Sequence, residues 1–151
     1  KGLEFDVIYL PGYYNEAGLI IKQARTQGIT APILGADGFA APELVDLAGA
    51  SALTNVYFTN HYSNLDTDPM VQDFIKAFKA EYNKEPDGFH ALGYDLAKFV
   101  CDGIARAESL TGEAVKDALA ATKDFKGVTG TFSIDENHNP VKNIVVIDYE
   151  N

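Results

Sequence analysis

The feature that most constrains the fold is an alternation of two patterns in the first 60 residues. Short apolar runs, bounded by glycine, proline or aspartate, alternate with stretches whose apolar residues recur every three or four positions. This alternation is typical of parallel βαβ units, whose crossover helices cover the sheet. The sequence therefore predicts an α/β fold with a parallel sheet. The expected elements are strands at 6–10, 32–34 and 56–59 and helices at about 15–27 and 42–47.

Two loops of this predicted sheet carry residues that suit a small ligand. In open parallel sheets, ligands bind outside the carboxyl ends of the strands. Tyr13 follows the first strand, and Asp37 follows the second, with Phe39 close behind. An aromatic wall beside a carboxylate suits a small cation with an apolar body, because the carboxylate makes charge-assisted hydrogen bonds to an ammonium group. The alternative is that the tyrosine packs and Asp37 merely forms a turn, and the residue types alone leave both open.

Beyond residue 60 the pattern becomes helical and then alternating. Helices are expected at 69–82, 89–108 and about 112–122, the first of them capped by Asp68 before a proline. The tail from 129 to 149 alternates on both sides of a turn at 135–140, which predicts a C-terminal β-hairpin. Cys101 lies in the apolar pattern of the long helix, so we expect a buried, unreactive thiol.

Composition and motif searches exclude several classes of protein. The chain carries 22 acidic and 12 scattered basic residues, a net charge of −10, which does not suit a phosphate backbone. No apolar run approaches the roughly 20 residues that a bilayer span needs. The sequence contains no hydrolase elbow, zinc helix or phosphate-binding loop. Asp135 begins a calcium-like spacing, which fails because Pro140 replaces the required glycine. We therefore expect no metal, no cofactor and no enzymatic activity.

Several motifs, taken together and in order, resemble one family. They are Pro11-Gly12-Tyr13-Tyr14-Asn15-Glu16-Ala17-Gly18, Lys22-Gln23-Ala24-Arg25, Ile33-Leu34-Gly35-Ala36-Asp37-Gly38, Phe89-x-Ala91-Leu92-Gly93-Tyr94-Asp95 and Gly127-Val128-Thr129-Gly130. This combination resembles the leucine/isoleucine/valine-binding family of type I periplasmic substrate-binding proteins, which serve ABC amino-acid importers. The resemblance covers nearly the whole chain. It implies an extracytoplasmic protein, in the periplasm or lipid-anchored at the cell surface, that delivers an amino acid to a membrane permease.

The resemblance also implies a set of ligand-binding residues. Asp37 is similar to the family's acid that binds the α-ammonium group of the substrate. Tyr13 resembles the aromatic residue that lies against the same group. Phe89 falls where the family often has an aromatic residue near the substrate side chain. Branched-chain amino acids are the default ligand, although relatives accept other small molecules. The alternative is a sensor domain of a receptor or regulator with the same fold.

The chain departs from the family in its length. Family members have two lobes and are roughly twice as long, and their first lobe holds the substrate carboxylate through Ser/Thr hydroxyls and backbone amides. By the family pattern, residues 1–60 belong to lobe 2, 61–128 to the helical part of lobe 1, and 129–151 return to lobe 2. We therefore expect the N-terminal half of the protein to lie upstream of residue 1. We also expect the isolated piece to expose apolar faces and open strand edges, and favour its pairing into a dimer.

Overall fold

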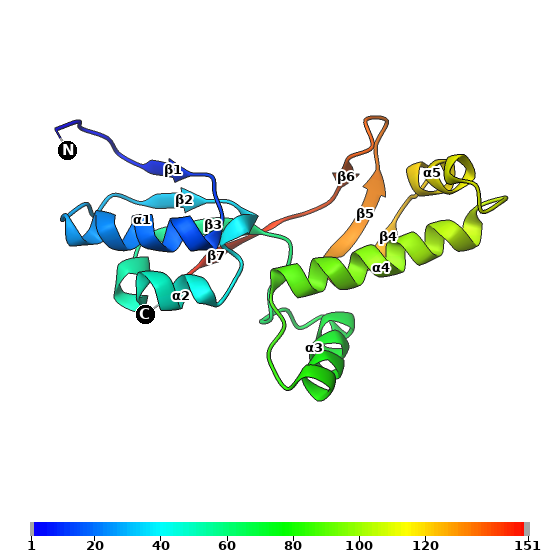
Figure 1. Cartoon of the computed structure of the whole chain (residues 1–151), viewed down its shortest axis with the longest axis horizontal. Helices are drawn as coiled ribbons and strands as arrows, with labels where there is room; N and C mark the ends of the chain where they lie inside the picture. The colour runs from blue at the N-terminus through cyan, green and yellow to red at the C-terminus, as the bar shows by residue number, and fades with distance from the viewer. Residues whose placement is uncertain (1, 150–151) are drawn as a thin grey trace. The chain divides into compact units, whose positions relative to one another are not determined.

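The computed structural model describes residues 2–149, which divide into two compact units. Within the described residues, the first unit consists of 2–63 and 145–149, and the second of 64–144. Figure 1 shows the elements of both. None of the described helices combines the length and hydropathy needed to cross a bilayer.

The first unit is built on a four-stranded sheet. Its strands are β1 (Ile8–Leu10), β2 (Ile33–Gly35), β3 (Val56–Asn60) and β7 (Val145–Asp148), in the order β1-β2-β3-β7. The first three run parallel, as predicted, and β7 pairs antiparallel with β3. The connections are α1 (Tyr14–Thr26) between β1 and β2, and α2 (Glu43–Ala48) with a 3₁₀ turn at Ala50–Leu53 between β2 and β3.

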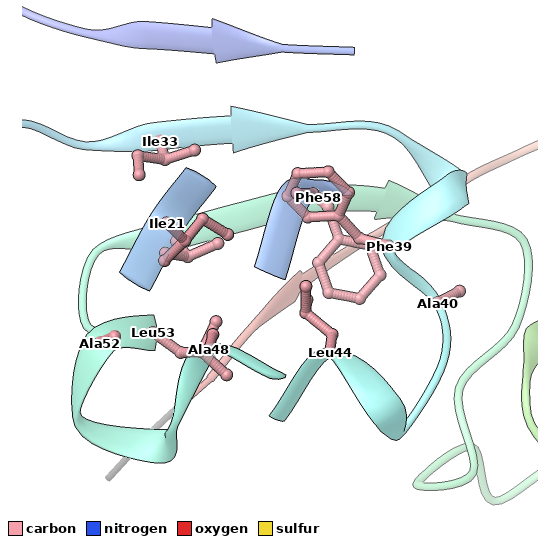
Figure 2. Close-up of a cluster of buried hydrophobic side chains, with 11 residues drawn as sticks. Ile21, Ile33, Phe39, Ala40, Leu44, Ala48, Ala52, Leu53 and Phe58 are labelled. Atoms are coloured by element: carbon pink, nitrogen blue, oxygen red, sulfur yellow. The ribbon is translucent and has the colours of Figure 1, made fainter. Parts of the chain in front are cut away.

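Both crossover helices pack on one face of the sheet. The chain crosses the sheet in one direction, from β1 to β2 and then to β3. Right-handed crossovers between these strands therefore place α1 and α2 on the same side of the sheet. Figure 2 shows the resulting core, in which Ile21 of α1 and Leu44 of α2 point toward Ile33 and Phe58 of the sheet. The fully buried members with the largest side chains are Phe39, Ile21, Ile33, Leu44, Leu53 and Val56.

The opposite face of the same sheet is uncovered. Tyr9 and Leu34, which lie side by side in register, are 69% and 41% exposed, and Val146 of β7 is 68% exposed. Parallel sheets are normally covered by helices on both faces, and their strands are apolar on both sides for that reason. The chain therefore has an apolar sheet face that no described element covers.

The contrast between the two faces gives a direct stability prediction. Ile33→Ala is expected to destabilise the first unit by about 2–4 kcal/mol, because it leaves a cavity among fully buried side chains. Leu34→Ala, its matched control one residue away, is expected to cost less than about 1 kcal/mol because its side chain already contacts solvent. Urea unfolding followed by circular dichroism measures both changes, and equal losses would contradict the one-sided core.

Arg25 ties the first unit together at the end opposite the strand C-termini. Its guanidinium donates to the carbonyl oxygens of Ile29 at 2.8 Å, Ala31 at 2.9 Å, Ala52 at 3.2 Å and Thr54 at 2.9 Å. Burial lowers the pKa of this guanidinium. The side chain thus links the end of α1 to the segments that lead into β2 and β3, and it does more than complement the helix dipole.

The second unit contains the three predicted helices, α3 (Pro69–Tyr82), α4 (Gly88–Arg106) and α5 (Gly112–Ala120). Each begins at a side-chain cap. Asp68 accepts from the Met70 N–H at 2.8 Å, as predicted, and Thr111 accepts from the Ala114 N–H at 3.3 Å. Asp87 accepts from the His90 N–H at 3.0 Å.

The C-terminal strands differ from the prediction in their partners. β5 (Gly130–Ile134) pairs antiparallel with β4 (Phe125–Gly127) and with the two-residue β6 (Pro140–Val141). A hairpin is therefore present across the turn at 135–139. The returning run, however, pairs as β7 with β3 and not with β5. The first unit accordingly resumes at Val145, whereas the family resemblance placed the return at residue 129.

α4 is apolar on its buried side and also exposes several apolar side chains. Phe99 packs against the rings of Phe125 and Phe132. On the same helix, however, Leu96 is 60% exposed and Ile104 is 41% exposed. The thiol of Cys101 is also exposed, which corrects the prediction of a buried cysteine. The helix is apolar over more of its circumference than the described residues of this unit cover.

A buried carboxylate joins α4 to the loop before β5. Asp95 is 4% exposed and accepts three hydrogen bonds, from the Val128 N–H at 2.8 Å, the Thr129 N–H at 2.8 Å and the Thr129 hydroxyl at 2.7 Å. Lys142 donates to the same hydroxyl oxygen at 2.7 Å. Burial lowers the pKa of the Lys142 ammonium, while the charge of Asp95 acts in the opposite direction. These contacts connect two motifs that are far apart in the sequence.

Candidate functional site

Three loops of the first unit meet at the carboxyl edge of the sheet. β1, β2 and β3 are parallel, so their C-terminal ends lie along one edge. Tyr13 follows β1, Asp37 follows β2, and His61 follows β3 directly. The sequence predicted the first two of these positions.

Asp37 is held by a short, well-anchored turn. It begins a 3₁₀ turn at Asp37–Phe39, in which the Ala40 N–H donates to the Asp37 carbonyl at 3.0 Å. The turn ends on Phe39, whose ring is fully buried and lies 5.9 Å, centroid to centroid, from the ring of Phe58. Figure 2 shows these two rings together in the core. The backbone under the acid is therefore fixed by core packing, while its side chain stays accessible to solvent.

Two glycines permit close packing around the Asp37 turn. A Cβ atom on Gly35 would lie 2.4 Å from the Phe39 ring, so this position must lack a side chain for the ring to pack. A Cβ atom on Gly38 would lie 2.4 Å from the Gly12 carbonyl oxygen and 3.1 Å from Cδ1 of Tyr13. The backbone beside Asp37 thus packs directly against Tyr13, and the structure brings these two predicted site residues together.

Both side chains remain accessible. The Tyr13 residue is 63% exposed and the Asp37 side chain 54% exposed. Tyr13 also serves as the N-cap of α1 without a side-chain capping bond, so the helix begins slightly earlier than predicted. Tyr14, the next residue, packs partly buried against the core. An accessible carboxylate beside an accessible phenol ring can accept hydrogen bonds from a small cation.

His61 is a member of this edge that sequence reasoning missed. Its Nε2 lies 3.3 Å from Oδ2 of Asp37, and its side chain is 27% exposed. His61, His90 and His138 are far apart in the sequence, and no spacing marks His61 as functional. Its position directly after a parallel strand is the signal that could have identified it.

Phe89 lies in the second unit, in the first turn of α4, and is 40% exposed. Its contact with the ligand side chain therefore stays a prediction. Among residues 2–149, no group of three or more histidine, cysteine, aspartate or glutamate side chains is arranged to hold a metal ion.

Comparison with known proteins identifies the family of the chain. The profile of the family described as Periplasmic binding protein matches residues 2–151 of the chain. The chain belongs to the periplasmic binding protein family. Solved structures of the type I fold superimpose on it, which confirms the predicted α/β class.

Named relatives of this periplasmic binding protein bind branched-chain amino acids. The leucine-, isoleucine-, valine-, threonine- and alanine-binding protein of Pseudomonas aeruginosa is 32% identical over 150 residues. The substrate-binding protein LivJ of Streptococcus pneumoniae, solved in complex with isoleucine, is 42% identical with a TM-score of 0.85. The leucine-binding protein LivK of Thermotoga maritima is 39% identical with a TM-score of 0.87.

The chain spans less than half of these relatives. It is covered almost completely in each comparison, 99% by the Pseudomonas protein and 97% by each of the two structures. It matches 38% of the Pseudomonas protein and 42% of each structure. This periplasmic binding protein sequence therefore corresponds to one part of a longer family architecture.

Proposed function

We propose that this chain supplies the ammonium-binding side of an amino-acid site in an extracytoplasmic substrate-binding protein of an ABC importer. In this proposal Asp37 accepts hydrogen bonds from the α-ammonium group and the Tyr13 ring lies against it. Phe89 contacts the ligand side chain, and the completed protein presents the amino acid to a membrane permease. The role is binding and not catalysis, and branched-chain amino acids are the proposed ligands.

One observation carries this proposal: an accessible carboxylate stands at the carboxyl edge of a parallel sheet, on a backbone that packs against Tyr13. A primary ammonium group needs several acceptors, and a carboxylate gives it the strongest one. The relatives named for leucine, isoleucine and valine support the ligand class. The partners of the ligand carboxylate belong, by family resemblance, to a part of the architecture outside the matched region.

A chimera with a relative of known structure tests the proposal, because the relative supplies the part of the family architecture that the chain does not match. The chain would replace the matched 42% of the Thermotoga leucine-binding protein, which is 39% identical to it. We expect calorimetric titration of the chimera to show leucine binding and no measurable binding of 4-methylpentanoate, which lacks the amine. Equal affinity for both compounds, or no affinity for any amino acid in a folded chimera, would contradict the proposal.

The isolated 151-residue chain is the matched control for the chimera. We expect its affinity for leucine to be at least about 100-fold lower, because the groups that would hold the ligand carboxylate are absent. Pairing of two isolated chains also stays a prediction, which light scattering of the purified chain measures.

A further inference from the structure

Asn60 fixes the backbone on which His61 stands. Its side chain is buried, with the residue 6% exposed at the end of β3. Its Oδ1 accepts from the His61 N–H at 2.8 Å, and its Nδ2 donates to the Tyr62 carbonyl at 2.9 Å. A buried amide that bonds the backbone on both sides of its neighbour restricts that neighbour's position. These two hydrogen bonds therefore hold the backbone of His61 in one position.

The environment of the imidazole determines which nitrogen carries the proton. A carboxylate oxygen can only accept, so the 3.3 Å contact requires Nε2 of His61 to donate to Oδ2 of Asp37. Nδ1 is buried and finds no hydrogen-bond partner within residues 2–149. A proton on Nδ1 would make it a buried donor without an acceptor. Such a donor costs more free energy than a buried ring nitrogen that lacks a donor. The geometry thus favours the tautomer that carries its hydrogen on Nε2.

We propose that His61 is a positioning residue that holds one carboxylate oxygen of Asp37, leaving the other oxygen for the ligand's ammonium group. This inference rests on the proposed function and adds a residue that the sequence did not identify. The Asp37 side chain is more than half exposed, and without a partner it would have to be ordered when the ligand binds. The bond to His61 orders it beforehand, supported in turn by the buried Asn60.

Three substitutions in the chimera separate this role from a general effect on folding. His61→Leu removes the donor, His61→Gln places an amide nitrogen at a similar reach, and His61→Asn ends one bond short of it. We expect His61→Leu and His61→Asn to raise the Kd for leucine about three- to tenfold, the effect of ordering one side chain on binding. His61→Gln is expected to stay within about twofold of the parent, because it restores the hydrogen bond.

Two results would overturn the inference. The first is an unchanged leucine affinity in His61→Leu. The second is an equal loss in His61→Leu and His61→Gln at equal thermal stability, which would indicate a packing role. If the parent chimera binds no amino acid, the proposed function fails separately. Nitrogen-15 NMR of the isolated chain in mildly alkaline buffer still tests the pair: we expect the proton on Nε2 of His61, and a proton on Nδ1 would contradict the arrangement.

Discussion

Replacing Asp37 with alanine is expected to raise the Kd for leucine roughly 100-fold, about 3 kcal/mol, in the chimera with the Thermotoga relative. The physical reason is that the ligand's ammonium group is desolvated on binding and would lose its charged acceptor. The fold should survive, because the Asp37 side chain is 54% exposed and the turn is anchored by Phe39. Calorimetric titration measures the change in affinity, and thermal unfolding checks the fold.

Two further variants at this position separate charge from shape. Asp37→Asn keeps an acceptor oxygen and the approximate volume but loses the charge, so we expect a loss about as large as that of alanine. Asp37→Glu keeps the charge on a longer side chain and is expected to retain most of the affinity. An alanine variant that binds leucine as tightly as the parent would remove Asp37 from the site.

Replacing Asp95 with asparagine is expected to destabilise the second unit by about 3–4 kcal/mol. The asparagine amide would face the Val128 and Thr129 N–H groups, which Asp95 now satisfies at 2.8 Å each, and leave at least one of them unpaired. Urea unfolding followed by circular dichroism measures the loss. Hydrogen exchange should show the amides of Val128 and Thr129 losing protection.

Asp102 on the same helix provides the matched control. Its carboxylate accepts from Nε of Arg106 at 2.8 Å, but both side chains are partly exposed, 43% and 38% respectively. Asp102→Asn is therefore expected to cost less than about 1 kcal/mol. Similar losses for the two variants would show that Asp95 acts as an ordinary surface charge.

The parallel sheet and part of the candidate site could be predicted from local patterns. The alternation of periods in the first 60 residues predicts β1, α1, β2, α2 and β3, because each element is apolar at its own spacing. The rule that ligands bind at strand carboxyl ends then selects Tyr13 and Asp37. Their proximity in the structure follows from the parallel register and from Gly38, whose missing side chain lets the loops touch.

The remainder depends on long-range contacts that leave no local pattern. The run that becomes β7 is apolar and short, and its residues do not reveal whether β5 or β3 is its partner. Asp95 appears in the sequence as one acid in a helix, and its role follows only from the approach of Val128 and Thr129. Cys101 was expected to be buried because α4 is apolar around it, although exposure depends on which neighbours are present.

The order in which the chain crosses the sheet, from β1 to β2 to β3, restricts how additional strands could cover its exposed face. β7 occupies one border, so β1 is the border to which further parallel strands could add. A strand joined directly to β1 would advance in the same direction as β1 to β2, so its helix would lie on the side of α1 and α2. A connection that runs outward, from a strand beside β1 to one farther away, would carry its helix to the far side of the sheet. The uncovered side chains of Tyr9 and Leu34 lie there. Covering that apolar surface in this way therefore takes at least two added strands, of which the first pairs with the free edge of β1 and the second follows it outward through a helix.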